Sequence, residues 1–569
     1  MIQLEVSCKQ SHKHFLDFLL SLPTEGAQVI YLQLPAWRPG RYELQNYARY
    51  IQRMEVFSQT GQKLPLERLG RNRWKVEVGN ADRILVRYNF YACQLDAGGC
   101  FLDHDLCYIN WSNCVFYVEG RIYQPYQISL DLPEDYQISF PLTALGRNQF
   151  QAIDFYQLID APLVASPNLQ HRTYKVENSS AVFHVWFYGN CLPNWQRLIA
   201  DFQKFTREHI ALFGQFPELE FHFQFLIAPW KFYHGVEHRR STVLVLGPDA
   251  EFEEEDFYHE LLEIASHELF HCWNGTRIRP VELTPYDLTR ECLFPTGFVI
   301  EGITTFYGSY LLYCSGVWSL QRWIEEINAQ LKRYANNFGR KYMSLVEASL
   351  DLWTDGYTAG IPHRKISIYN EGALAALLLH LWLLEVTQGK YSLHHLMQLL
   401  WKRFGNGLQG YSLQDYKQLV AELAGYSMNQ YFEDYIEGTE ELSQAIGKLA
   451  HWIGCKLEIV PAKHAWERRF GFTLTQSAHY LQVVHICPDS PADRAIAPGD
   501  KILSINDLVT QDLAEVAWLM DHAAQIKLVV NRNERLHQIT LQADGKDYFS
   551  YPRLELLNSQ MSIQTASGA

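Results

Sequence analysis

Short runs of alternating apolar and polar residues fill the first part of the chain. Trp74–Val78 and Ile84–Tyr88 are examples, and Gly, Asn and Asp residues typical of turns lie between such runs. Alternation of this kind favours strands that have one buried face. Residues 1–165 are therefore predicted to form an N-terminal β-rich domain of the β-sandwich type.

The pattern becomes mixed from residue 166. Residues 219–225 alternate strictly, as a half-buried strand would, and Thr242–Leu246 is a continuous apolar run that suits a buried strand. After Glu251 helical spacing dominates to about residue 450. A small sheet followed by a helical half predicts a mixed α+β domain over residues 166–455, and a multidomain α+β protein as a whole.

Short strand patterns return near the C-terminus. Apolar runs at Leu481–Val484 and Ile526–Asn531 flank a helical pattern near Leu513–Ala523. This order resembles a PDZ domain, which we predict over residues 456–546. The resemblance implies that Phe470, Gly471 and Phe472 form a loop whose backbone N–H groups bind the C-terminus of a peptide. A structural module without a ligand is the alternative.

Helical spacing also places candidate chemistry on one face of a helix at residues 257–274. His267 and His271 are four residues apart, so both imidazoles can reach one metal ion. Glu268 follows the first histidine and is placed to act as a general base. His-Glu-x-x-His is the signature of zinc metallopeptidases, so the sequence predicts one zinc ion per chain. A run of carboxylates at Glu253–Asp256 suits the start of this helix.

A zinc site of this type needs a third protein ligand. Glu301 is the best candidate, because it is the only carboxylate in the apolar helical segment 298–308. A buried carboxylate requires a cation beside it. The alternative cation is an arginine, and Arg277 and Arg279 are available.

These residues resemble the glycyl-aminopeptidase family of zinc metallopeptidases, which belongs to the gluzincin group. The matching segments follow the family's order along nearly the whole chain: Leu34–Tyr42, Gly235–Thr242, His267–Pro280, Glu301–Gly308 and Tyr369–Leu374. The resemblance implies a thermolysin-like mixed and helical peptidase domain followed by a C-terminal PDZ domain. It also implies zinc-dependent hydrolysis of N-terminal residues, such as Gly or Ala, from peptides.

The resemblance alone gives the remaining site residues. Tyr369 is implied as the catalytic tyrosine that donates a hydrogen bond to the oxyanion. Glu237, with Gly235 and His238, lies in the segment that binds the free N-terminus of the substrate. A surface ion pair between Glu237 and a neighbouring arginine, Arg239 or Arg240, is the rival interpretation.

Two segments depart from the family pattern. Glu371 stands where the family has a lysine, and Phe298–Ile300 replaces a segment that normally carries Trp and Ser. The proposed ligands, base and tyrosine are all present. These departures therefore bear on substrate preference more than on catalysis.

Composition excludes several classes of function. The chain has 569 residues, of which 47% are hydrophobic and 14% aromatic, which fits several well-packed domains. A net charge of −14 argues against nucleic acid and anionic membranes as partners. Gly372–Val386 is the longest apolar stretch and is too short to span a bilayer. The N-terminus lacks the pattern of a signal peptide, so we expect a cytoplasmic protein.

Eleven scattered cysteines without a Cys-x-x-Cys pair favour buried free thiols over a cysteine zinc site. The end of the chain, residues 547–569, is predicted to be a disordered tail.

Other functions remain open at this point. The same site would serve a zinc endopeptidase or a hydrolase of non-peptide bonds, and a non-catalytic scaffold would act through the PDZ-like domain alone. The expected partners are peptides with a free N-terminus and, at the PDZ-like domain, a peptide C-terminus.

Overall fold

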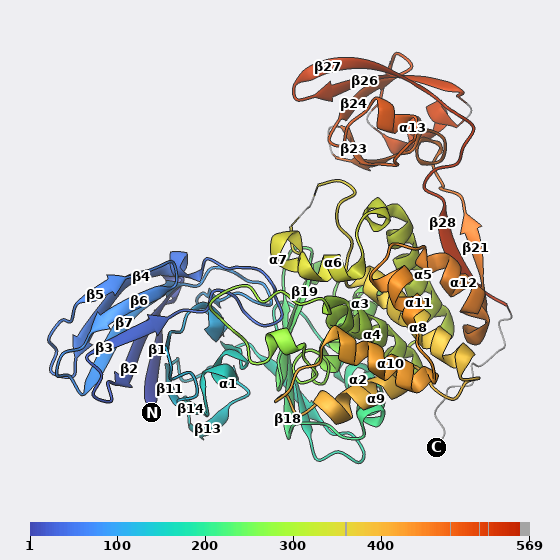
Figure 1. Ribbon diagram of the computed structural model, residues 1–569. Coiled ribbons are helices and arrows are strands. Elements are labelled where there is room, and N and C mark those ends of the chain that lie inside the picture. The colour runs from blue at the N-terminus through green and yellow to red at the C-terminus, as the bar shows by residue number, and fades with distance from the viewer. Residues whose placement is uncertain (359–360, 478–479, 511, 522, 558–569) are drawn as a thin grey trace. The chain divides into compact units, whose positions relative to one another are not determined.

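The computed structural model describes residues 1–358, 361–477, 480–510, 512–521 and 523–557 (Figure 1). These residues form two compact units. The first comprises residues 1–319, 346–358 and 393–428, and the second comprises 320–345, 361–392 and 429–557. The predicted multidomain α+β class is confirmed. The predicted domain boundaries at residues 165, 455 and 546 stay predictions.

Three sheets make up the N-terminal domain in the first unit. Phe116 joins two of them, because its ring packs edge-on against both Trp74 and Tyr88, each at 5.2 Å. The predicted β-sandwich character is therefore confirmed. In spatial order the strands are β13 (Thr143–Gly146), β14 (Gln149–Ala152), β11 (Tyr126–Asp131), β1 (Ile2–Gln10), β2 (Phe15–Pro23), β7 (Arg83–Tyr91) and β4 (Ile51–Ser58); then β10 (Tyr117–Val118), β3 (Val29–Gln33), β6 (Arg73–Glu77) and β5 (Leu66–Arg68); then β12 (Gln137–Ser139), β15 (Leu163–Ser166), β9 (Cys107–Ile109) and β8 (Phe101–Leu102).

A five-stranded sheet follows in the same unit. Its central strands β17, β18 and β20 are parallel, and β19 is an antiparallel edge strand. The edge strand ends at Glu237, which places this carboxylate at the rim of the sheet. The strand order is β16 (Gln170–Tyr174), β17 (Val182–Tyr188), β18 (Glu220–Ile227), β20 (Ser241–Gly247) and β19 (Phe232–Glu237).

Strand β18 is buried on both faces, so the prediction of a half-buried strand is wrong. Phe221, Phe223 and Phe225 lie on one face and are fully buried. The polar face is covered as well, since Gln224 donates a hydrogen bond to Oγ of Ser139 at 2.8 Å. Polar residues alternate along β18 because they pair with polar groups of β12 in the N-terminal domain, and not because they face water.

Most helices follow the sheet in the sequence, as predicted, but α1 precedes it and α2 lies between β17 and β18. Helix α3 begins at Glu255 and carries Glu255 and Asp256 in its first turn, where carboxylates suit the helix dipole. Among the described residues, no helix is both long enough and apolar enough to cross a bilayer. The helices outside the PDZ domain are α1 (Phe155–Ile159), α2 (Trp195–Phe213), α3 (Glu255–Phe270), α4 (Ile303–Cys314), α5 (Leu320–Asn336), α6 (Leu345–Leu350), α7 (Leu352–Asp355), α8 (Asn370–Val386), α9 (Leu393–Phe404), α10 (Leu413–Ala424), α11 (Asn429–Tyr431) and α12 (Leu442–Leu449).

The PDZ domain of the second unit is built around one sheet and helix α13 (Leu513–Met520). Strand β22 forms an edge of this sheet, and its Gln476 accepts a hydrogen bond from the backbone N–H of Leu513 at the start of α13. The strands in spatial order are β22 (Phe472–Gln476), β23 (Leu481–Ile486), β24 (Lys501–Ile505), β26 (Gln525–Arg532) and β27 (Arg535–Gln542), with β25 (Leu508–Val509) paired to β24.

The prediction that residues 547–569 form a disordered tail is wrong for residues 551–556. Tyr551–Leu556 form strand β28, which pairs antiparallel with β21 (Cys455–Val460). The backbone of Leu554 exchanges two hydrogen bonds with the side chain of Asn328 on α5, at 3.0 and 2.7 Å. Residues 558–569 lie outside the described part of the chain. The PDZ domain is thus inserted between two paired strands.

Because Val460 pairs with Tyr551, the two ends of this insertion are adjacent. We expect that replacing residues 462–549 by a short Gly/Ser linker leaves β21 and β28 paired. Deletion of residues 461–569 should instead lower the melting temperature by about 5 °C or more, because it exposes the face of α5 that β28 covers. Thermal unfolding followed by circular dichroism measures both variants. Equal melting temperatures would mean that β28 contributes nothing to the second unit.

Candidate active site

Helix α3 brings the two predicted histidines together at its C-terminal end. The Nε2 atoms of His267 and His271 are 3.2 Å apart. Helix α4 passes close to this turn at Gly308, where a Cβ atom would lie 3.1 Å from Cβ of His267. The ring of Phe270 also stacks on Tyr307 of α4, with centroids 4.6 Å apart. A glycine at 308 therefore allows the two helices to pack around the histidines.

Glu301 lies on a π-helical turn, Phe298–Gly302, directly before α4. Its Oε2 atom is 3.4 Å from Nε2 of His271 and 3.8 Å from Nε2 of His267. Turns of this type are rare and are frequent at functional sites. The sequence predicted a helix here but not the wider turn that points the carboxylate at both imidazoles.

The three donor atoms suit a metal ion. Nδ1 of His271 donates to the backbone carbonyl of Asn274 at 2.8 Å, which leaves the Nε2 lone pair free. The alternative of an arginine partner for Glu301 is wrong. Arg277 pairs with Glu218, and Arg279 donates to the carbonyl of Gly407.

Asn274 is a positioning residue that sequence reasoning did not single out. Its side-chain amide donates to the carbonyls of Val299 and Ile300 at 2.9 and 3.0 Å, and to Oγ1 of Thr304 at 3.1 Å. These bonds hold the π-helical turn that carries Glu301, while the Asn274 carbonyl orients His271. The sequence feature that could have identified Asn274 is its position three residues after His271.

Two further carboxylates, Glu268 and Glu237, lie beside the metal ligands. One carboxylate oxygen of each is within 4.8 Å of the other and of a ring nitrogen of His271. Glycines make room for both. A Cβ atom on Gly235 would lie 2.2 Å from Oε1 of Glu268, and one on Gly40 would lie 2.5 Å from Oε2 of Glu237.

Burial and like charge set the electrostatics of this group. Burial raises the pKa of Glu268 well above its usual range, and the charges of Glu237 and Glu301 raise it further. Burial lowers the pKa of His271, but the neighbouring carboxylates, led by Glu301, outweigh it and raise the pKa to about 10. Burial lowers the pKa of His267. Three carboxylates around two imidazoles create a strong demand for a cation.

The rival interpretation of Glu237, a surface pair with an arginine, is not what the structure contains. Arg240 pairs with Glu218 and Glu220, and the closest polar contact of the Arg239 guanidinium is the carbonyl of Thr276 at 3.5 Å. His238, also predicted at the substrate site, is buried with its Nδ1 atom 3.4 Å from Oδ1 of Asp160.

The remaining candidates belong to the second unit. Tyr369 is the residue at the N-terminal end of α8. Glu371 is buried and accepts hydrogen bonds from Nδ2 of Asn337 and the backbone N–H of Ser367. Burial raises the pKa of Glu371 to about 7. This carboxylate is therefore part of the packing at the start of α8.

The structure of the predicted peptide-binding loop of the PDZ domain, residues 470–472, agrees only in part with a role in binding a carboxylate. The side chains of Phe470 and Phe472 are fully buried in the domain core. Gly471 has a positive φ of 78°, and its N–H donates to the carbonyl of Glu467 at 3.1 Å. One of the N–H groups expected to bind a carboxylate is thus already used.

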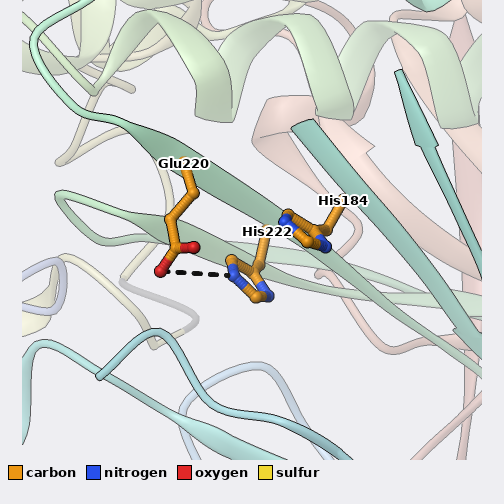
Figure 2. A group of neighbouring side chains, drawn as sticks. All are labelled: His184, Glu220 and His222. Carbon is orange, nitrogen blue, oxygen red and sulfur yellow. Dashed lines mark ion pairs between the residues drawn. The ribbon is translucent and has the colours of Figure 1, made fainter. Parts of the chain in front are cut away.

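A second group of possible metal ligands lies on β17 and β18 (Figure 2). His184 and His222 are direct neighbours across these strands, with nearly parallel rings 4.4 Å apart, and Glu220 lies beside His222. This carboxylate already has a cation, because Arg240 donates to it. The indole N–H of Trp186 donates to Nδ1 of His222, so a neutral His222 carries its proton on Nε2. The first group is the better metal site.

Comparison with protein families gives three matches. The model of the peptidase M61 N-terminal domain matches residues 3–167, that of the M61 glycyl aminopeptidases matches residues 260–375, and that of a PDZ domain matches residues 482–532. A comparison with curated protein sequences gave no match.

The fold is shared with a solved structure. An aminopeptidase N family protein from Idiomarina loihiensis is 24% identical, with a TM-score of 0.90 over 98% of each chain. An M1 zinc metallopeptidase from Deinococcus radiodurans is 14% identical, with a TM-score of 0.46 over 77% of this chain and 93% of that one. Yeast LTA4 hydrolase is 11% identical, with a TM-score of 0.46 over 77% of this chain and 68% of that one.

If the first group holds a divalent metal ion, Glu301→Gln should weaken metal binding by about 100-fold or more, because the variant removes a charged ligand and keeps its shape. His184→Gln, in the second group, is the matched control and should bind metal normally. Metal content after dialysis against chelators of graded strength measures both. Loss of metal in the control and its retention in Glu301→Gln would place the ion on β17 and β18.

Proposed function

Because the chain belongs to the M61 glycyl aminopeptidase family and is a metallopeptidase, we propose that it is a zinc-dependent aminopeptidase. It removes N-terminal residues from peptides, and the family resemblance favours small residues such as Gly or Ala. The observation that carries this proposal is the convergence of His267, His271 and Glu301 next to the buried Glu268.

His267, His271 and Glu301 are the zinc ligands in this proposal. When bound, zinc supplies a Lewis acid that makes a water molecule acidic near neutral pH and polarises the scissile carbonyl. The protein's part is to hold two imidazole nitrogens and one carboxylate oxygen in a fixed arrangement. The hydrogen bonds of Asn274 to both ligand-bearing segments support that arrangement.

Glu268 is the general base. Its Oε2 atom is buried and has no hydrogen-bond partner among the described residues, so it is free to accept a proton from the attacking water. Burial raises the pKa of this carboxyl group, which brings it towards the range in which it can both take a proton and pass it to the leaving amine.

Glu237 is the anchor for the substrate's α-ammonium group. It lies beside Glu268 and the metal ligands, and it also lines the adjoining cavity. No ion pair within the described residues neutralises it. A carboxylate that is left without a cation in this position suits a peptide N-terminus, and binding there fixes which peptide bond reaches the metal.

Tyr369 completes the proposed machinery. By family resemblance it donates a hydrogen bond to the oxyanion that forms on the scissile carbonyl, an interaction that stabilises the transition state more than the substrate. Tyr369 directly precedes α8 in the second unit, two residues before the buried Glu371.

The PDZ domain has a separate proposed role, which is to bind the C-terminal segment of a peptide. Strand β22 is an edge strand beside α13, and an extended peptide can add to such an edge through backbone hydrogen bonds.

Glu268→Gln should bind zinc nearly normally but lose most activity. The variant removes the base and leaves all three proposed ligands in place, and general base catalysis contributes about 100- to 10,000-fold to the rate. Steady-state hydrolysis of an alanyl or glycyl amide, together with zinc analysis of the same sample, measures the effect. Turnover near that of the wild type would mean that the base lies elsewhere.

Glu237→Gln should raise KM for peptides with a free N-terminus, because Gln keeps the shape but loses the charge that binds the ammonium. A charge-assisted hydrogen bond of this kind contributes roughly 1.5–3 kcal/mol, which corresponds to about a 10- to 100-fold effect on kcat/KM. The control substrate is the same peptide with an acetylated N-terminus, which should be a poor substrate of both proteins. An equal loss on both substrates contradicts the aminopeptidase assignment and favours an endopeptidase.

A further inference from the structure

A cavity of about 600 Å³ has Glu237 in its lining but none of His267, His271 and Glu301. Four arginines also line it, which are Arg38, Arg239, Arg240 and Arg279. This volume is within the range of small-molecule sites and accommodates a few amino acids. The cavity and the metal centre share Glu237, so a substrate held by this carboxylate reaches both.

Three of these arginines form no ion pair with a carboxylate in the described part of the chain. Arg38 donates to the backbone carbonyl of Pro39, and the other two are Arg239 and Arg279. Arg279 is buried, its guanidinium lies over the ring of Tyr286 at 4.5 Å, and one N–H donates to the carbonyl of Gly407 at 3.1 Å. Its Nε atom is buried without a hydrogen-bond partner. Among the described residues, the guanidinium of Arg239 has one hydrogen-bond acceptor, the carbonyl of Thr276 at 3.5 Å.

Arg239 and Arg279 reach the same point in the cavity. Arg279 bonds to the backbone of Gly407, and a terminal nitrogen of Arg239 lies 3.1 Å from where a Cβ atom on Gly407 would be. Burial lowers the pKa of Arg239, the charge of Asp160 opposes this effect, and the charges of Arg277 and Arg279 add to it. A half-buried guanidinium group near a buried one is costly unless an anion joins them.

The nearby carboxylates have other partners. Glu218 is paired with Arg277 and Arg240, and Glu220 is paired with Arg240. Asp160 accepts the backbone N–H of Arg239 at 3.1 Å and lies beside His238, and it forms no ion pair with the Arg239 guanidinium within the described residues. The charges of Arg239 and Arg279 are therefore left for a ligand.

Given the proposed aminopeptidase function, on which this inference rests, we propose that Arg239 and Arg279 bind a carboxylate of the substrate. Arginine pairs with carboxylates through two parallel hydrogen bonds, and Glu237 in the same cavity binds the ammonium group. The preferred substrates are then short peptides that carry a negative charge as well as a free N-terminus. The carboxylate comes either from an acidic first residue or from the C-terminus of a short peptide.

Binding measured in the Glu268→Gln background tests this proposal without turnover of the peptide. Isothermal titration compares two matched pairs of ligands. Glu-Gly-Gly amide against Gln-Gly-Gly amide reports an acidic first side chain, and Ala-Gly-Gly against Ala-Gly-Gly amide reports a free C-terminus. In one pair the ligand with the carboxylate should bind at least about tenfold more tightly.

Arg239→Gln and Arg279→Gln should each remove that preference. Arg279 is the more buried of the two, so its variant is the one more prone to misfold. In that case the Arg239→Gln variant alone still tests the proposal. Arg240→Gln is the matched control, because Arg240 lines the same cavity but is already paired with Glu218 and Glu220. This control should keep the preference.

Equal affinity within both pairs, or a preference that survives both variants, overturns the proposal. Hydrolysis of neutral peptides by the wild-type protein tests the proposed function separately. Activity on neutral peptides without any carboxylate preference leaves the aminopeptidase assignment standing and rejects the carboxylate site. A carboxylate preference without any hydrolysis supports the site and rejects the assignment.

Discussion

The arrangement of the proposed metal ligands depends on one buried residue, Asn274. Its backbone carbonyl accepts the Nδ1 proton of His271, and its amide bonds to two carbonyls of the π-helical turn that carries Glu301. A π-helical turn departs from regular helical hydrogen bonding, so its carbonyls need other donors. One asparagine therefore satisfies the irregular backbone and fixes the two ligand-bearing segments relative to each other.

One part of the site could be predicted from local periodicity alone. Helical spacing places His267 and His271 on one face of α3, whatever the rest of the chain does. The clearance provided by Gly40 and Gly235 could not be predicted in this way. It depends on contacts with Glu237 and Glu268, which lie far from Gly40 in the sequence and become neighbours only in the folded first unit.

Nonlocal pairing also explains the two errors in the predicted fold. Pro552 within Tyr551–Leu556 argues against a strand, but proline is tolerated on an edge, and within the described residues β28 has β21 as its one strand neighbour. Strand β18 has the alternating pattern of a half-exposed strand because buried polar groups repeat the pattern that water-facing groups produce. Its partner, Ser139, lies in a different sheet. In both cases the neighbour that decides the structure is distant in the sequence.

Three carboxylates lie around the proposed metal site, and their surroundings distinguish the functions proposed for them. Glu301 faces two imidazole nitrogens, which suits a ligand. Among the described residues, Glu268 has an oxygen without a hydrogen-bond partner, in a buried setting that disfavours its charge, which suits a base. Glu237 lies at the end of an edge strand and faces a cavity, which suits an anchor for a cation. Identical chemical groups acquire different roles because burial and neighbouring charge alter their affinity for protons and cations. A bound divalent ion would offset the repulsion that all three share, so metal binding and the assembly of this site are thermodynamically linked.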